Sequence, residues 1–425
     1  MVRVVLVRHG HTAWNTSKGQ DKRFRGTVDL PLASDGVLQA KATARFLADR
    51  PLSAIYSSPL QRAARTAEII AEPHGLRVQS LPGLQSMNYG AWAGQYGSQV
   101  ARLWPDLYTH WLQDPFGVQI PDGERASDFR DRVAVSIRTV LPHHDNGDTI
   151  VIVSHQAVIK TLVCVLGGLP NTAYWQVRQD LCNLSRFDYD PAADSFALVG
   201  LNDTCHLDTQ LPGVTDGNTR ILLIRHGQTA WNIGAGDERF RGRTDLPLDE
   251  TGRAQALAVA RRLQGEQIVA VYTSPLLRTR QTGMPLAGEF GLPVQSHKGL
   301  IDIDYGCFQG LFHSEAATAY PDLYALWRTR PGQVHFPGGE GLEDVRVRIR
   351  ALLAEMASRH AGQTIALIGH QIVNKALACT LLGLDLDQIW RVQQDTCGID
   401  LFQRMDKSYH TLALNDVCHL RSGGV

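Results

Sequence analysis

The chain has no excess of charge of either sign, since 42 lysine and arginine residues balance 42 aspartate and glutamate residues. This balance predicts a surface without affinity for nucleic acid or for a membrane, so any cation that matters must act locally. Long apolar runs are missing too, and no stretch reaches the length of a transmembrane helix. Arg3 and Arg8 interrupt the apolar stretch that follows Met1, so we expect no signal peptide.

Cysteine is scarce, with seven residues in a chain of 425. An odd number without a secretory signal indicates a reducing compartment, and we therefore expect the protein in the cytoplasm. None of the cysteines has the spacing of a zinc site, so we predict no metal and no cofactor. Buried, small apolar side chains are the expected role of three cysteine pairs that recur at matching places in the two halves: Cys164/Cys379, Cys182/Cys397 and Cys205/Cys418.

The most informative pattern that is present is the tripeptide Arg-His-Gly, which occurs twice. Each copy follows an apolar run and precedes a polar residue and Thr-Ala-Trp-Asn, so that the pattern spans residues 4–15 and again 222–232. A short apolar run that ends in a cation, an imidazole and a glycine places a basic cluster at the carboxyl end of a strand. Open α/β sheets hold their ligands at that end.

The repeat extends far beyond this motif and keeps its order. Matching segments include Phe24-Arg25-Gly26 with Phe240-Arg241-Gly242, Ser58-Pro59-Leu60 with Ser274-Pro275-Leu276, Gly123-Glu124 with Gly339-Glu340, and His155-Gln156 with His370-Gln371. A period of about two hundred residues is too long for a solenoid and indicates duplication of a whole domain. We therefore predict one domain over residues 1–208, a linker over 209–218 and a second domain over 219–425.

Within each copy, strand patterns alternate with helix patterns. We predict strands at 2–7, 54–56, 149–153 and 364–368, and helices at 34–48, 124–141 and 156–166, with Pro59 in the first turn of a further helix. This alternation predicts the α/β class, with two tandem three-layer αβα domains, each with a mostly parallel central sheet flanked by helices. Tryptophans at 111, 175, 327 and 390 recur between the copies; core packing is their expected role, and a pocket rim is the alternative.

Four side chains of the first copy are predicted to meet at one sheet edge, because His9 and His155 each follow a strand. The guanidinium groups of Arg8 and Arg62 offer forked donors that match a phosphate. His155 opens a helix, whose N-terminus also favours an anion. A neutral imidazole at His9 could attack phosphorus through its free nitrogen. The second copy repeats the set as Arg225, His226, Arg278 and His370.

With these motifs the chain resembles the histidine phosphatase superfamily, in its phosphoglycerate-mutase-like branch, over nearly all of both copies. The resemblance implies a phosphoric monoester hydrolase of the histidine acid phosphatase type, in which His226 is the nucleophile that becomes phosphorylated. It also implies that Arg225, Arg278 and His370 bind the phosphoryl group with Thr229 and Asn232. The matching residues of the first copy are Arg8, His9, Thr12, Asn15, Arg62 and His155. Family members need no metal.

One position departs from the family pattern, in which a glutamate protonates the leaving oxygen. The second copy has Asp302 there and the first has Ser86. A serine hydroxyl cannot serve as a general acid near neutral pH, so we expect the first domain to be impaired. The Gly-Glu segments add Glu124 and Glu340 as candidate substrate-binding residues. The alternative proton donors are Asp304 and Glu340 in the second copy and Glu124 in the first.

These observations predict a metal-independent phosphomonoester hydrolase that acts through a phosphohistidine on a small phosphorylated metabolite. A mutase-type phosphoryl transferase is the first alternative, although mutases of this branch carry a longer insertion than either copy here. The second alternative is a first domain that only binds phosphorylated ligands in a regulatory role. The organic part of the substrate and the oligomeric state are left open, since specificity lies in variable loops.

Overall fold

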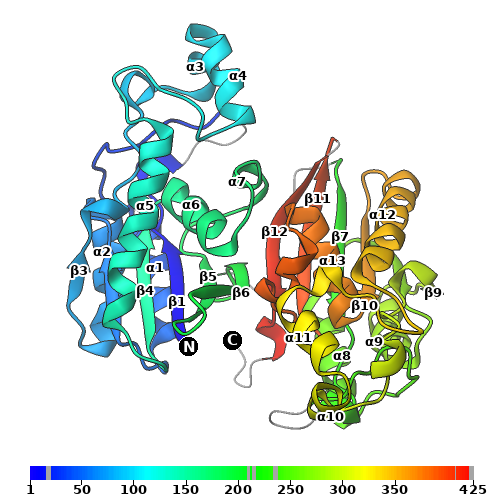
Figure 1. The fold of residues 1–425 in the computed structure, drawn as a ribbon. Coiled ribbons are helices and arrows are strands. Elements are labelled where there is room, and N and C mark those ends of the chain that lie inside the picture. Colours follow the sequence, from blue (N-terminus) through cyan, green and yellow to red (C-terminus); the bar gives the residue numbers. More distant parts are fainter. Residues whose placement is uncertain (16–20, 208–210, 213–216, 233–237, 407, 421–425) are drawn as a thin grey trace. The chain divides into compact units, whose positions relative to one another are not determined.

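The computed structural model describes residues 1–15, 21–207, 211–212, 217–232, 238–406 and 408–420. The chain forms two compact units, Met1–Thr209 and Gln210–Val425 (Figure 1). Most of the predicted linker, residues 209–218, lies outside the described residues, so its role stays a prediction.

The first unit is built around a sheet in which the order is β3-β2-β4-β1-β5-β6. Strands β1 to β4 run parallel to one another. Strand β5 is antiparallel to β1, and β6 is antiparallel to β5. The bounds are β1 Val2–Arg8, β2 Ala54–Ser57, β3 Val78–Ser80, β4 Thr149–Ser154, β5 Leu184–Asp190 and β6 Ser195–Asp203. Nearly every residue of β1 and β4 is buried, as expected for central strands covered on both faces.

Helices cover both faces of this sheet. Val5 and Val7 of β1 pack with α1 and α2, while the alternate residues Val4 and Leu6 are equally buried toward the other face. The bounds are α1 Ser34–Leu47, α2 Gln61–Ala71, α3 Gly97–Leu103, α4 Pro105–Gln113, α5 Ala126–Val140, α6 Gln156–Gly167 and α7 Ala173–Gln176. In Figure 1, the cyan pair α3 and α4 projects beyond the layered part of the first unit.

The second unit repeats the plan, with sheet order β12-β11-β7-β10-β8-β9. Its strands are β7 Thr219–Arg225, β8 Ile268–Thr273, β9 Val294–Ser296, β10 Thr364–Gly369, β11 Ile399–Met405 and β12 Ser408–Asp416. Its helices are α8 Glu250–Arg262, α9 Leu277–Glu289, α10 His313–Ala319, α11 Pro321–Thr329, α12 Leu342–Arg359 and α13 Gln371–Leu382. A 3-10 helix, η10 (Leu386–Arg391), stands where the first unit has α7.

The predicted fold class is confirmed, and the predicted strands and helices lie within a few residues of the observed ones. Pro59 is an exception: it lies before α2, which begins at Gln61, because Leu60 still has extended dihedral angles. Cys164, Cys182, Cys379 and Cys397 are buried as expected, whereas Cys205 and Cys418 are only half-buried. Among the described residues, no helix combines the length and the apolar character that crossing a bilayer requires.

Candidate active site

Strand pairing brings the two histidines of each copy together. In the first unit Arg8 of β1 pairs with Ser154 of β4, so His9 and His155 leave the same edge of the sheet side by side. Their ring centroids lie 5.3 Å apart. The equivalent rings of His226 and His370 lie 5.2 Å apart. The edge predicted from sequence therefore exists in both copies with nearly the same geometry.

The ring of the first histidine is held in one orientation by the backbone. Nδ1 of His9 donates to the carbonyl oxygen of Gly10 at 2.7 Å, which leaves Nε2 without a proton and free to attack. Burial, then the charges of His155, Arg62 and Arg8, lower the pKa of His9 well below its ordinary value. His226 makes the same bond to Gly227 at 2.7 Å, and burial and Arg278 lower its pKa likewise. Both imidazoles are therefore neutral near pH 7.

The glycine after each histidine is required by a close approach. A Cβ atom on Gly10 would lie 2.5 Å from the carbonyl oxygen of Gly36 at the start of α1. In the second copy, a Cβ atom on Gly227 would lie 2.6 Å from the carbonyl oxygen of Gly252. The loop behind each imidazole is thus packed directly against the first helix of its unit.

Arg8 and Arg62 of the first copy are buried, and neither forms an ion pair with a carboxylate in the part of the chain that the structure describes. Arg62 is 1 % exposed and donates to the carbonyl oxygens of Val28 at 2.7 Å and Gly26 at 2.9 Å. Arg8 donates to the carbonyl oxygen of Gln179 at 2.7 Å, and burial with the nearby charge of Arg25 lowers its pKa to about 9. Buried cations that bond only to carbonyls leave a positive potential that favours an anion.

Several buried nitrogen atoms around the histidines have no hydrogen-bond partner among the described residues. In the first copy these atoms are Nε of Arg8, Nε of Arg62 and Nδ1 of His155. Nε of Arg225 and Nε2 of His370 are in the same state in the second copy. Buried polar groups are nearly always bonded, so a cluster of unpaired donors indicates a site suited to an oxygen-rich ligand.

Arg278 takes part in a tighter network in the second copy. Its Nη atoms donate to the carbonyl oxygens of Thr244 and Gly242, each at 2.7 Å. Its Nε donates to Nδ1 of His370 at 3.1 Å. Nη2 also lies 3.2 Å from Oδ2 of Asp302, and this carboxylate lies 3.6 Å from Nδ1 of His370.

Asp302 therefore lies beside His370, one of the second pair of histidines. Burial raises its pKa above the ordinary value, although the charge of Arg278 opposes the shift. A carboxyl group with a raised pKa in contact with the anion site has the properties of a proton donor. Ser86 lines the equivalent cavity in the first copy and is 5 % exposed. The two copies thus differ in chemistry at one shared position.

Two further predicted site residues, Glu124 and Glu340, are not among the described residues that line the cavities over the histidines. Glu124 is bound by Arg132 through two hydrogen bonds, of 2.5 and 2.9 Å. Glu340 is held by Arg243 at 2.9 Å and Arg348 at 3.4 Å. Both carboxylates are thus engaged by arginines away from the cavity linings.

Thr12 and Asn15 bond to each other. The Thr12 hydroxyl donates to Oδ1 of Asn15 at 2.7 Å, and the Thr229 hydroxyl donates to Oδ1 of Asn232 at 2.9 Å. Both threonines are fully buried. Each asparagine, together with Arg8 or Arg225, lines a second cavity, of about 380 Å³ in the first copy and about 420 Å³ in the second. The turn thus fixes the asparagine amide close to the basic cluster.

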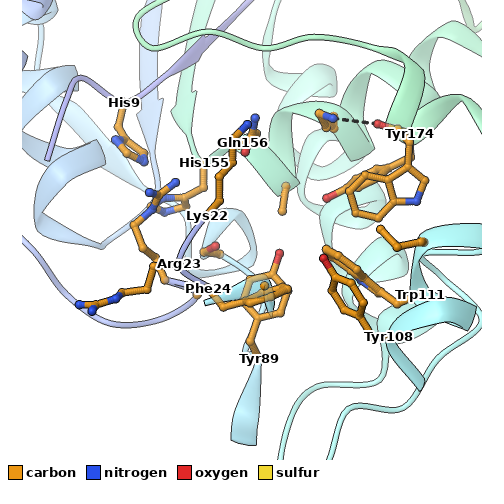
Figure 2. A pocket seen from close by; sticks show the side chains of 18 of the residues that line it. His9, Lys22, Arg23, Phe24, Tyr89, Tyr108, Trp111, His155, Gln156 and Tyr174 are labelled. Carbon is orange, nitrogen blue, oxygen red and sulfur yellow. Dashed lines mark hydrogen bonds between the residues drawn. The ribbon is translucent and has the colours of Figure 1, made fainter. Parts of the chain in front are cut away.

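A cavity opens over the histidines of each copy, with a volume of about 360 Å³ in the first and about 540 Å³ in the second. In the first cavity, His9 and His155 lie on one side, and Tyr108, Trp111 and Tyr174 form an aromatic wall on the other (Figure 2). The recurring tryptophans thus serve the wall as well as the core. Trp111 and Trp175 meet edge to face at 4.4 Å, and Trp327 and Trp390 at 5.2 Å.

Sequence reasoning missed several cavity residues, including Lys22, Arg25, Tyr89 and Lys160. Two of these residues, Arg25 and Lys160, could have been found from the sequence. Arg25 belongs to a repeated Phe-Arg-Gly segment, and Lys160 with its counterpart Lys375 is the one charged residue in an otherwise apolar helical run of each copy.

Residues 4–204 and 221–417 match the sequence model of the histidine phosphatase superfamily (branch 1), and the chain belongs to that family. Phosphoserine phosphatase 1 of Hydrogenobacter thermophilus is 33 % identical over 202 residues, which are 47 % of this chain and 94 % of that protein. A probable phosphoglycerate mutase of Yersinia pestis is 31 % identical over 211 residues, or 49 % of this chain and 96 % of the relative. Each relative therefore spans one copy of the duplicated domain.

Two solved structures are also similar to this chain. YhfR of Bacillus stearothermophilus is 27 % identical, covers 48 % of this chain and 100 % of its own, and has a TM-score of 0.46. The mycobacterial glucosyl-3-phosphoglycerate phosphatase Rv2419c is 26 % identical, covers 47 % of this chain and 99 % of its own, and has a TM-score of 0.43.

Proposed function

We propose that the second copy is a metal-independent phosphomonoester hydrolase that forms a phosphohistidine at His226. The observation that carries the proposal is the cavity that the neutral, backbone-oriented imidazole of His226 shares with the protonatable carboxyl group of Asp302. This carboxyl group pairs with His370, and unpaired buried donors lie beside them. The substrate is a small phosphorylated metabolite that fits the cavity of about 540 Å³. We also propose that the protein works in the cytoplasm.

The reaction proceeds in two displacements. Nε2 of His226 attacks phosphorus, the bond to the leaving oxygen breaks, and the Asp302 carboxyl donates its proton to that oxygen. A water molecule then gives a proton to the Asp302 carboxylate and attacks the phosphohistidine, which releases inorganic phosphate and restores the imidazole. Arg225, Arg278 and His370 face the phosphoryl oxygens and stabilise the charge that develops on them.

Hydrolysis is favoured over phosphoryl transfer by the compactness of each copy, which lacks a long insertion that would enclose a bisphosphate. Relatives named as a phosphatase and as a probable mutase both exist, so the products must be measured. A mutase would convert 3-phosphoglycerate to its 2-isomer and release little phosphate.

The first copy is proposed to bind the same kind of phosphoryl group and to turn it over slowly. Its imidazole, arginines and unpaired donors match those of the second copy, but Ser86 supplies no acidic proton. A regulatory binding role for this domain follows naturally if its turnover proves negligible.

The test is release of inorganic phosphate from a panel of phosphomonoesters, with and without excess chelator. We expect the same rate in both, and quenching without acid should trap base-stable, acid-labile phosphate on the chain. The matched control is His226→Ala, in which the adduct of the second copy disappears. Activity that chelator abolishes and metal restores, or turnover without a trapped adduct, would overturn the mechanism.

A further inference from the structure

One position on the cavity wall carries opposite charges in the two copies. The carbonyl oxygen of Lys22 accepts from the amide of Gly97 at 3.1 Å, and that of Glu238 accepts from the amide of His313 at 3.2 Å. The next residues, Arg23 and Arg239, form equivalent bridges to the same helix starts. Lys22 and Glu238 therefore stand at equivalent places, and each lines the cavity over its histidines.

The ammonium group of Lys22 makes no hydrogen bond or ion pair within the described part of the chain. Burial, followed by the charges of Arg8 and Arg178, lowers its pKa, and the charge of Asp180 opposes the shift. Glu238, in contrast, forms an ion pair with Nη1 of Arg241 at 3.2 Å. The wall thus carries an ammonium group without an ion pair in the first copy and a carboxylate paired with an arginine in the second.

A second cation faces the same space from α6. Lys160 is 8 % exposed, and its Nζ donates to the carbonyl oxygen of Tyr174 at 3.0 Å (Figure 2). It lies 5.2 Å from the Tyr174 ring and 5.6 Å from the Trp175 ring. Burial lowers the pKa of Lys160 to about 7; the charge of Lys22 adds to the shift, and the charge of Asp180 opposes it. The two lysines line the same cavity.

The lining of the first cavity holds arginines and lysines, and no aspartate or glutamate stands among its described residues. The phosphoryl group of a substrate satisfies the donors beside His9. Lys22 and Lys160 line the same cavity, and neither ammonium group forms an ion pair with a carboxylate in the described part of the chain. Buried cations without a partner are costly, so their retention indicates a second negative group in the ligand.

We propose that the first pocket binds phosphomonoesters that carry a second anionic group, a carboxylate or a second phosphate, between Lys22 and Lys160. Glu238 makes the second pocket discriminate against the same group, although Lys375 retains the cation of the helix. Lys22 and Glu238 are thus specificity-determining residues that give the two copies different substrates. The inference rests on the proposed function, because the phosphoryl end of the ligand is placed on the basic cluster.

The test uses the full chain with His9→Ala and His226→Ala, so that ligands bind without turnover. Two probes differ only in the second group: 3-phosphoglycerate has a carboxylate where glycerol 3-phosphate has a hydroxymethyl group. By titration calorimetry, we expect 3-phosphoglycerate to bind one site about tenfold or more tightly than the other, on the scale of a hydrogen bond to a charged group. Glycerol 3-phosphate should bind the two sites much more evenly.

Substitutions then assign the sites. Lys22→Glu and Lys160→Met should each weaken the tight 3-phosphoglycerate site about tenfold, and Glu238→Lys should strengthen the weak one. Lys41→Glu is the matched control, because it makes the same charge change at an exposed position of α1 outside the cavity. An unchanged ratio of the two ligands after both Lys22→Glu and Lys160→Met would overturn the proposal.

The same binding measurements distinguish a carboxylate from a second phosphate as the bound anion. They also test the anion subsite separately from the proposed hydrolase function. Propane-1,3-diol bisphosphate, compared with the monophosphate, tests a second phosphate in place of the carboxylate. If the wild-type chain releases no phosphate from any ester but still prefers 3-phosphoglycerate to glycerol 3-phosphate at one site, the proposed function is wrong and the anion subsite stands. If the chain hydrolyses p-nitrophenyl phosphate but binds the two ligands equally at both sites, the function stands and the subsite is wrong.

Discussion

Asp302 and Ser86 occupy the same position in two nearly identical settings, so they isolate what a single carboxyl group contributes. Asp302 lies 3.2 Å from Arg278 and 3.6 Å from His370. Removing it changes the supply of a proton and leaves the histidines and most of the phosphate donors in place. A substitution at Asp302 can therefore separate phosphate binding from proton transfer.

The second copy should have a bell-shaped dependence of kcat on pH, with an optimum on the acid side of neutrality. His226 must be neutral, and its pKa is lowered by burial and Arg278, so activity rises as pH passes that value. Asp302 must be protonated, and its pKa is raised by burial, so activity falls as pH rises through it. The measurement is the pH profile of an alkyl phosphate in the His9→Ala chain.

Asp302→Asn should remove the alkaline limb of this profile and lower kcat for alkyl phosphates about 10²- to 10⁴-fold. An activated aryl ester should lose far less, because its leaving group needs no proton. An alkaline limb that persists in Asp302→Asn would assign the proton to another group.

At the scale of elements, the two copies also differ in the strand beside the central one. Ser185 of β5 pairs with Leu6 of β1, and Asp400 of β11 pairs with Leu223 of β7, so the two positions are equivalent. Both bind the same glutamine and asparagine neighbours: Ser185 contacts Gln179 and Asn202, and Asp400 contacts Gln394 and Asn415. Burial raises the pKa of Asp400 to about 7.

Asp400 should make the second unit less stable as pH rises. Its folded pKa lies above the unfolded value, so its contribution to stability is complete below about pH 4 and is lost as pH rises through about 7. About three pKa units correspond to roughly 4 kcal/mol at alkaline pH. Asp400→Ser, which installs the side chain of the first copy, should therefore raise the melting temperature at pH 8 much more than at pH 5.

Calorimetric unfolding at both pH values checks this expectation. The mirror substitution Ser185→Asp should lower the stability of the first unit at pH 8. An equal effect of Asp400→Ser at pH 5 and pH 8 would show that packing, and not ionisation, governs the position.

Elements that carry strong periodicity could be predicted from sequence. The apolar runs of β1 and β4 and the following helices placed the two histidines on one edge correctly. Helices α3 and α4 were not predicted, because they are short, with seven and nine residues. They contribute to the lining of the cavity through Gly97, Tyr108 and Trp111. Pro59 was misplaced by two residues, since a proline in the first turn and one just before the helix look alike in sequence.

The walls of the site could not be predicted for a different reason. Lys160 contacts Tyr174 and lines the same cavity as Lys22 only through tertiary packing, and no local pattern encodes that arrangement. The repeat showed that Lys160 recurs as Lys375, but recurrence alone does not distinguish a cavity lysine from a solvated one. Likewise, Glu124 and Glu340 sit in repeated motifs yet are engaged by arginines.

At the scale of the whole molecule, the two copies should contribute unequally to turnover. His226→Ala should remove most alkyl-ester activity, whereas His9→Ala should cost much less, because only the second copy has a carboxyl group at the acid position. p-Nitrophenyl phosphate should reveal residual activity in the His226→Ala chain. Adding Ser86→Glu to that chain should raise its alkyl-ester kcat, and the measurement is phosphate release by each variant on both substrates.

Equal losses of alkyl-ester activity in the two single histidine variants would contradict this asymmetry. In that case the first copy would draw its proton from a group other than Ser86, and Glu124 would need to leave Arg132 to provide it. A Glu124→Gln variant of the His226→Ala chain would then lose activity.

Two cavities of different volume and charge on one polypeptide also shape every measurement on the intact protein. The observed velocity is the sum of two hyperbolae, so a single Michaelis constant describes neither site. Its Eadie–Hofstee plot curves and its Hill coefficient falls below one, as in negative cooperativity, even when neither site senses the other. An inhibition constant from the intact chain is likewise a weighted mean whose value shifts with the substrate chosen for the assay.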